Sequence, residues 1–171
     1  MSEPLPFDPV ERASESWASH YPEAGELVYS SMRAVTSIMR AQQILIADLD
    51  NTLKPFGLTF SRYEALMLLT FSSSGALPLS KVGERLQVHA TSVTNVIDRL
   101  SESGFVHRQP NPRDGRGTLA VITDSGRQVA DAATRELHKH RFGLEGLQID
   151  DLQRLFAILR QLRVGASDFV G

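Results

Sequence analysis

The chain has 171 residues, of which 42% are hydrophobic and 22% are charged, and it contains no cysteine. This is the size of one globular domain with a substantial core, and the lack of cysteine excludes disulfides, thiolate nucleophiles and thiol redox switches. Eighteen basic and 20 acidic side chains give a formal net charge of -2. This balance excludes a uniformly basic coat, so any nucleic-acid surface must be local.

The N-terminal segment lacks the basic and apolar regions of a signal peptide, and no apolar run approaches the roughly 18 residues of a membrane span. We therefore expect a cytoplasmic protein without a membrane partner. The sequence shows no Gly-rich phosphate loop, nucleophile elbow or metal-ligand spacing. Neither an enzyme nor a cofactor or metal site is expected.

Residues 26–53 have apolar side chains every three or four positions, which predicts a long amphipathic helix. Two short strands, 105–109 and 118–123, flank a Pro- and Gly-rich link and predict a hairpin. Similar patterns predict the remaining helices, which span 61–72, 79–86, 90–103, 124–140 and 149–164. The fold class is therefore mainly α with a small β-hairpin.

The first long helix and the last helix carry apolar stripes. The segment between them is too small to bury both stripes. We expect these helices to pack on each other and on a second copy of the chain, as a homodimer. A monomeric helical bundle is the alternative.

Residues 79–123 have the layout of a winged helix-turn-helix, because two short helices precede a hairpin that would form the wing. In the second of these helices, Val93, Ile97 and Leu100 share one face, with Val96 beside them. The opposite face carries polar side chains. This predicts a helix with one side in the core and the other available to a DNA groove.

Residues 78–116 hold six basic and four acidic side chains, whereas residues 1–60 hold four basic and eight acidic ones. The middle of the chain is therefore its positive part, although a solvated surface would explain so small an excess equally well.

Short polar groups suit base edges and phosphates. We expect DNA contacts from Thr91, Ser92, Thr94, Asn95 and Arg99, with helix capping as the alternative role of Thr91 and Ser92.

Two acidic residues on the exposed face, Asp98 and Glu102, oppose a close approach to phosphates. We expect them to lie away from DNA or to pair with an arginine of the hairpin. At the hairpin tip, Arg113 and Arg116 can enter a minor groove, where arginine is favoured. The acidic residue between them, Asp114, is expected to hold Arg116 in position.

Several short motifs occur in order: Asp98-Arg99-Leu100, the run Gly104 to Arg108, Asp114-x-Arg116, and Ile122-Thr123-x-x-Gly126. Together they resemble the MarR family of bacterial transcriptional regulators over nearly the whole chain. The resemblance implies a homodimer that binds double-stranded DNA at a pseudo-palindromic operator. It also implies a repressor that a small molecule releases, with Ser80 and Lys81 near the DNA backbone.

The resemblance also assigns regions. It implies an N-terminal extension over 1–25, a dimerisation helix over 26–57, a winged helix-turn-helix DNA-binding domain over 58–123 and C-terminal dimerisation helices over 124–171. The alternative function is a protein-interaction module that retains the fold without binding DNA.

The N-terminal extension contains the sole tryptophan, Trp17, and resembles the extra helix of the urate-responsive MarR subgroup. That likeness implies a small organic effector, anionic or aromatic, near Trp17 and Glu64. The resemblance makes 90–103 the recognition helix, which has Val96 where that subgroup carries an arginine. This difference argues against urate. Alternatively, Trp17 only fastens the extension to the rest of the protein.

Overall fold

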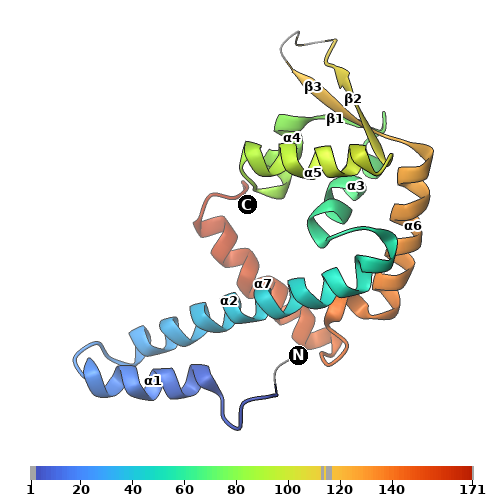
Figure 1. The fold of residues 1–171 in the computed structure, drawn as a ribbon. Coiled ribbons are helices and arrows are strands. Elements are labelled where there is room, and N and C mark those ends of the chain that lie inside the picture. The colour runs from blue at the N-terminus through green and yellow to red at the C-terminus, as the bar shows by residue number, and fades with distance from the viewer. Residues whose placement is uncertain (1–2, 113, 115–116, 171) are drawn as a thin grey trace. The chain divides into compact units, whose positions relative to one another are not determined.

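The computed structural model describes residues 3–112, 114 and 117–170 (Figure 1). The chain forms two compact units, Met1–Asp48 and Leu49–Gly171, and one long helix crosses their boundary. The helices are α1 (Pro9–His20), α2 (Glu26–Leu53), α3 (Phe60–Phe71), α4 (Leu79–Leu86), α5 (Ala90–Glu102), α6 (Asp124–Lys139) and α7 (Ile149–Gly165). The strands are β1 (Ala76–Pro78), β2 (Val106–Pro110) and β3 (Thr118–Ile122).

The N-terminal unit pairs α1 with the first part of α2, which lie side by side in Figure 1. Asp8 caps the N-terminus of α1, because its carboxylate accepts a hydrogen bond from the backbone N–H of Val10 at 2.8 Å. The Tyr29 hydroxyl of α2 donates to the carbonyl of Tyr21 at 2.7 Å. An additional N-terminal helix is thus present, as the resemblance implied.

The C-terminal unit is built around a three-stranded antiparallel sheet in the order β1-β3-β2. The predicted hairpin is confirmed, with Val106 opposite Ile122 and Pro110 opposite Thr118. Strand β1 was not predicted, because three residues ending in proline show no alternation that could reveal a strand.

Helices α3 to α6 enclose one apolar core with this sheet. Leu66 and Leu69 of α3 meet Ile97 and Leu100 of α5, and all four are fully buried. The start of α3 is fixed from α2, because Asp50 accepts a hydrogen bond from the backbone N–H of Phe60 at 2.7 Å. This core holds α5 with one face inward and the other free.

The link from the wing into α6 depends on a close backbone approach. The Thr123 hydroxyl accepts a hydrogen bond from the N–H of Gly126 at 3.0 Å and donates to the carbonyl of Gly104 at 2.8 Å. A Cβ atom at Gly126 would lie 2.1 Å from the carbonyl oxygen of Phe105. The Ile-Thr-x-x-Gly pattern therefore marks the place where α6 touches the link between α5 and β2.

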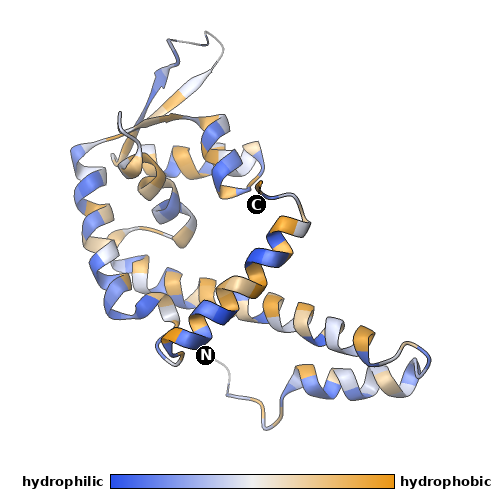
Figure 2. Cartoon of the chain, turned by 180° about the vertical axis from the view of Figure 1, so that it is seen from behind, coloured by the Kyte–Doolittle hydropathy of each residue, from blue (hydrophilic) through white to orange (hydrophobic). Residues whose placement is uncertain are grey.

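Helices α2 and α7 each contain many apolar residues (Figure 2). Several of their apolar side chains are exposed. None of the residues in α7 is buried, and Phe156, Ile158 and Leu162 are each more than 60% exposed. On α2, Leu27, Val35 and Ile44 are similarly exposed. Exposed apolar stripes of this length are typical of surfaces that bind another protein chain. In the described part of the chain, no helix combines the length and apolar character that crossing a membrane requires.

Candidate nucleic-acid interface

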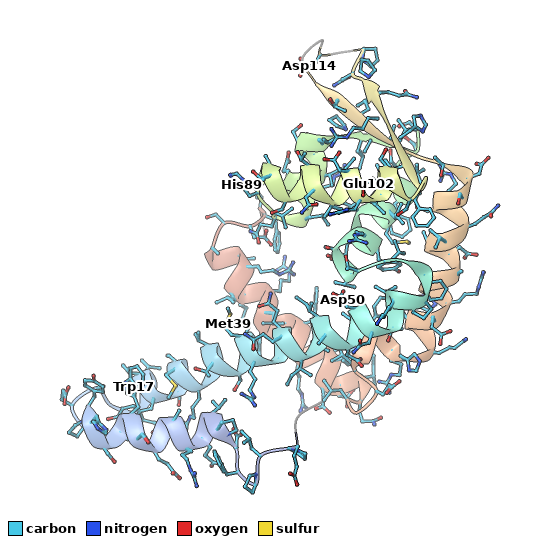
Figure 3. All side chains as sticks on the ribbon, in the orientation of Figure 1. Trp17, Met39, Asp50, His89, Glu102 and Asp114 are labelled. Atoms are coloured by element: carbon cyan, nitrogen blue, oxygen red, sulfur yellow. The ribbon has the colours of Figure 1, made fainter. Side chains whose placement is uncertain are left out.

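Helix α5 separates a core face from a polar face, as the sequence predicts. Val93, Ile97 and Leu100 are buried in the core, and Val96 is half-buried. The exposed residues include Thr91, Ser92, Thr94, Asn95 and Arg99, which are the predicted DNA contacts on this helix. Figure 3 labels His89 and Glu102 near the two ends of the helix and Asp114 at the tip of the wing.

The start of α5 is capped by a residue that we did not predict. The His89 ring accepts a hydrogen bond from the backbone N–H of Thr91 at 3.3 Å and lies 3.2 Å from the Thr91 hydroxyl. The side chains of Ser92 and Asn95 make no hydrogen bond to any residue that the structure describes. The alternative capping role of Thr91 and Ser92 is therefore wrong, since His89 occupies that position.

The polar face of α5 is tied to the wing by an ion pair. Arg108 of β2 lies 2.7 Å from the carboxylate of Asp98, and its guanidinium also donates to the carbonyl of Thr94 at 3.4 Å. The prediction that an acidic residue of this helix pairs with an arginine of the hairpin is confirmed. The pair connects the wing to α5 and balances the negative charge of Asp98.

We expect Asp98→Asn to weaken specific DNA binding about threefold to tenfold, because it loosens the link between β2 and α5 without removing a DNA contact. The protein should unfold within a few degrees of the wild type, since both partners are substantially exposed. Fluorescence anisotropy with operator and random DNA measures the effect, and Asp131→Asn on α6 is the control. An unchanged affinity would show that the ion pair does not position the wing.

A polar hollow of about 400 Å³ adjoins this face, between α5 and the start of α3. Asn95 and Arg99 line it on one side, and Thr59, Ser61 and Arg62 line it on the other. The pair between Arg99 and Glu102, at 3.0 Å, is exposed and easily exchanged for a phosphate. The sequence alone did not predict that Thr59, Ser61 and Arg62 lie beside α5. They are about 30 to 40 positions away along the chain and come close to α5 only when it folds.

A second hollow of about 400 Å³ lies where α4 meets the wing. It brings together Ser80, Lys81, Asn111 and Asp114, so the two residues expected near the DNA backbone share one surface with the acidic residue of the wing. Lys81 lies 2.6 Å from the carboxylate of Glu84, and its hydrogen bond lowers the pKa of that carboxyl group. The other two predicted wing contacts, Arg113 and Arg116, and the predicted pair of Asp114 with Arg116, lie outside the described residues.

A third hollow, which we call the cavity, is more apolar than these two and lies between α3, α4 and α6. It has a volume of about 480 Å³ and is walled mainly by apolar and aromatic side chains of α3, α4 and α6. Glu64, which the resemblance linked to an effector, lines this cavity, and burial raises the pKa of its carboxyl group. Trp17 lies in the N-terminal unit, where its ring packs 5.6 Å from that of Tyr21.

The raised pKa of Glu64 predicts a pH-dependent stability. Burial disfavours the ionised form of Glu64 in the folded state. The stability that the folded protein has with a neutral Glu64 is therefore lost as pH rises from about 4.5 through the folded pKa. Glu64→Gln removes the ionisation. We expect the melting temperature of this variant, relative to the wild type, to increase between about pH 4 and pH 7. A constant difference in melting temperature across that range would contradict a desolvated carboxylate.

Two short helices with a free polar face, followed by a β-hairpin, define a winged helix-turn-helix protein. The MarR family model matches residues 58–118. The structure is similar to that of Sco5413, a MarR family transcriptional regulator from Streptomyces coelicolor, with a TM-score of 0.78 and 59% identity over 83% of this chain and 99% of that one. The chain belongs to the MarR family of transcriptional regulators.

Two other comparisons agree with this assignment. The HTH-type transcriptional repressor IacR of Pseudomonas putida is 28% identical over 116 residues, which cover 66% of this chain and 68% of IacR. A mutant of E. coli MarR, solved in complex with operator DNA, has a TM-score of 0.70 at 22% identity, over 81% of this chain and 99% of that chain. At this identity the second likeness supports the fold alone.

Proposed function

We propose that this protein is a homodimeric repressor that reads a pseudo-palindromic DNA operator with α5 and the wing. The observation that carries the proposal is the exposed face of α5, where Ser92 and Asn95 have no hydrogen-bonding partner among the described residues. A major groove supplies donors and acceptors for such groups. The protein acts by binding rather than by catalysis.

Basic side chains lie beside this face and can contact DNA phosphates. Arg62 and Arg99 border the hollow on one side of the face, and Lys81 lies at the base of the wing. Phosphate contacts of this kind set the register, and the short polar groups between them read the bases. Arg113 and Arg116 add two positive charges to the wing.

The exposed apolar side chains of α2 and α7 support the dimer. Regions 26–57 and 124–171 are the proposed dimerisation parts, because both carry apolar side chains that the described chain leaves uncovered. A twofold axis would present two copies of α5 about one DNA turn apart. The cavity beside Glu64 is the proposed effector site, and its occupation would release the operator.

A gel-shift titration tests this proposal, with DNA from upstream of the protein's own gene and a shuffled duplex of the same composition. We expect preferential binding to the upstream DNA and a steep fall in affinity between about 50 and 200 mM salt, because phosphate contacts release counterions. Equal affinity for both duplexes would contradict a self-regulating repressor. The absence of any binding would favour the protein-interaction module instead.

A further inference from the structure

The hydroxyl of Thr91, near the N-terminal end of the exposed face of α5, contacts the residue that caps this helix. The backbone N–H of Thr91 donates to Nδ1 of His89 at 3.3 Å, and the Thr91 hydroxyl oxygen lies 3.2 Å from the same nitrogen. Both residues are exposed. Ser92 and Asn95 make no hydrogen bond to any residue that the structure describes. Thr91 differs from these two neighbours because its hydroxyl is already engaged.

The direction of the contact between the two side chains follows from the backbone. A backbone N–H can only donate, so Nδ1 of His89 is an acceptor and the ring carries its proton on Nε2. The same nitrogen cannot donate to Thr91, and the hydroxyl therefore donates to the ring. Two donors share one lone pair, which agrees with the length of both contacts. The single hydroxyl proton of Thr91 is thereby turned toward His89.

A hydroxyl whose proton is engaged presents only lone pairs to a ligand. Phosphate oxygens are acceptors, as are O6 and N7 of guanine and O4 of thymine, so none of these groups matches the Thr91 hydroxyl. The matching donors in the major groove are the exocyclic amino groups of adenine and cytosine. The first residues of a recognition helix are the ones that reach base edges. Thr91 is therefore suited to a base edge rather than to the DNA backbone.

We propose that His89 is a positioning residue for base recognition, which holds the Thr91 hydroxyl as an acceptor so that Thr91 selects adenine or cytosine at one position of each half-site. The selection rests on the proposed reading of DNA by α5. Without His89 the hydroxyl turns freely and can donate or accept, so it meets all four bases alike.

Fluorescence anisotropy on the full chain tests the selection, with duplexes from upstream of the protein's own gene in which each base pair is replaced in turn by the other three. We expect the wild type to prefer adenine or cytosine over guanine or thymine about tenfold at one position of each half-site, the usual effect of a mismatched base pair. Thr91→Val keeps the shape and the backbone N–H but removes the hydroxyl. This variant should retain a preference of about twofold or less, because the hydrogen bond is lost.

The double variant separates positioning from helix capping. Loss of the cap alone should lower the melting temperature, and should weaken binding to every duplex by the same factor. Positioning predicts in addition that His89→Ala reduces the preference at the same position as Thr91→Val does. In the Thr91→Val background, His89→Ala should change this preference no further, because the two residues act through one hydroxyl. The melting temperatures of the four proteins show whether each variant folds.

The outcomes distinguish the role of His89 from the proposed function. If no position responds to both variants, or if His89→Ala weakens binding to all duplexes equally, the positioning role is overturned. A preference for guanine or thymine at the shared position would also overturn it, because those bases require a hydroxyl that donates. Equal affinity of the wild type for upstream and shuffled DNA would instead contradict the proposed function, and the role of His89 with it.

Discussion

Replacing Gly126 by alanine should destabilise the protein by about 3 kcal/mol, although alanine is normally the better helix former. The added methyl group would lie 2.1 Å from the carbonyl oxygen of Phe105 and 2.9 Å from a side-chain carbon of Ile122. Backbone cannot yield as a flexible side chain can, so α6 must move away from the link between α5 and β2. Thermal unfolding should show a fall in melting temperature of about 10 °C.

The matched control is Gly146→Ala, where a Cβ atom would meet nothing within 4 Å. Its stability should stay within about 0.5 kcal/mol of the wild type. If Gly126→Ala unfolds at the same temperature as this control, α6 does not approach the link between α5 and β2 as closely as described. The same pair of variants tests why the family motif ends in glycine.

The second large effect is expected at Asn95, in the middle of the exposed face of α5. Asn95→Ala should weaken operator binding by about tenfold to a hundredfold, because an amide that contacts a base edge contributes roughly 1–3 kcal/mol of discrimination. Binding to shuffled DNA should change little, so the preference for the operator is lost. Fluorescence anisotropy with both duplexes measures the two affinities directly.

Two further variants distinguish base reading from general attraction. Arg99→Ala should weaken binding to all sequences alike and reduce the slope of log affinity against log salt by about one, as loss of a phosphate contact requires. Gln128→Ala, an exposed amide on α6, serves as the control and should bind as the wild type does. Equal losses on operator and shuffled DNA for Asn95→Ala would reject its role in base reading.

Much of the fold could be predicted because its elements carry strong local signals. Helix α4 has the predicted bounds, Leu79–Leu86, and α5 ends at Glu102, one residue before the predicted end. The Pro- and Gly-rich link between two β-rich runs was sufficient to predict the hairpin. The buried face of α5 followed from the spacing of its apolar residues, and the pairing of Asp98 followed from its charge.

What could not be predicted depends on contacts between distant parts of the chain. Strand β1 exists because Ala76 and Leu77 pair with Val121 and Ala120, across more than 40 residues of sequence. Arg62 approaches Arg99 only once α3 packs beside α5. The effector cavity likewise joins residues of α3, α4 and α6, so Glu64 alone gave no indication of its walls.

The central claim is that a dimer places two recognition helices on DNA. Hydroxyl-radical footprinting of the DNA upstream of the protein's own gene tests it most directly. We predict two protected half-sites of related, inverted sequence, with centres about 10 base pairs apart on one face of the duplex. Asn95→Ala should weaken both protections together. A single protected half-site, or uniform protection without sequence symmetry, would contradict the account.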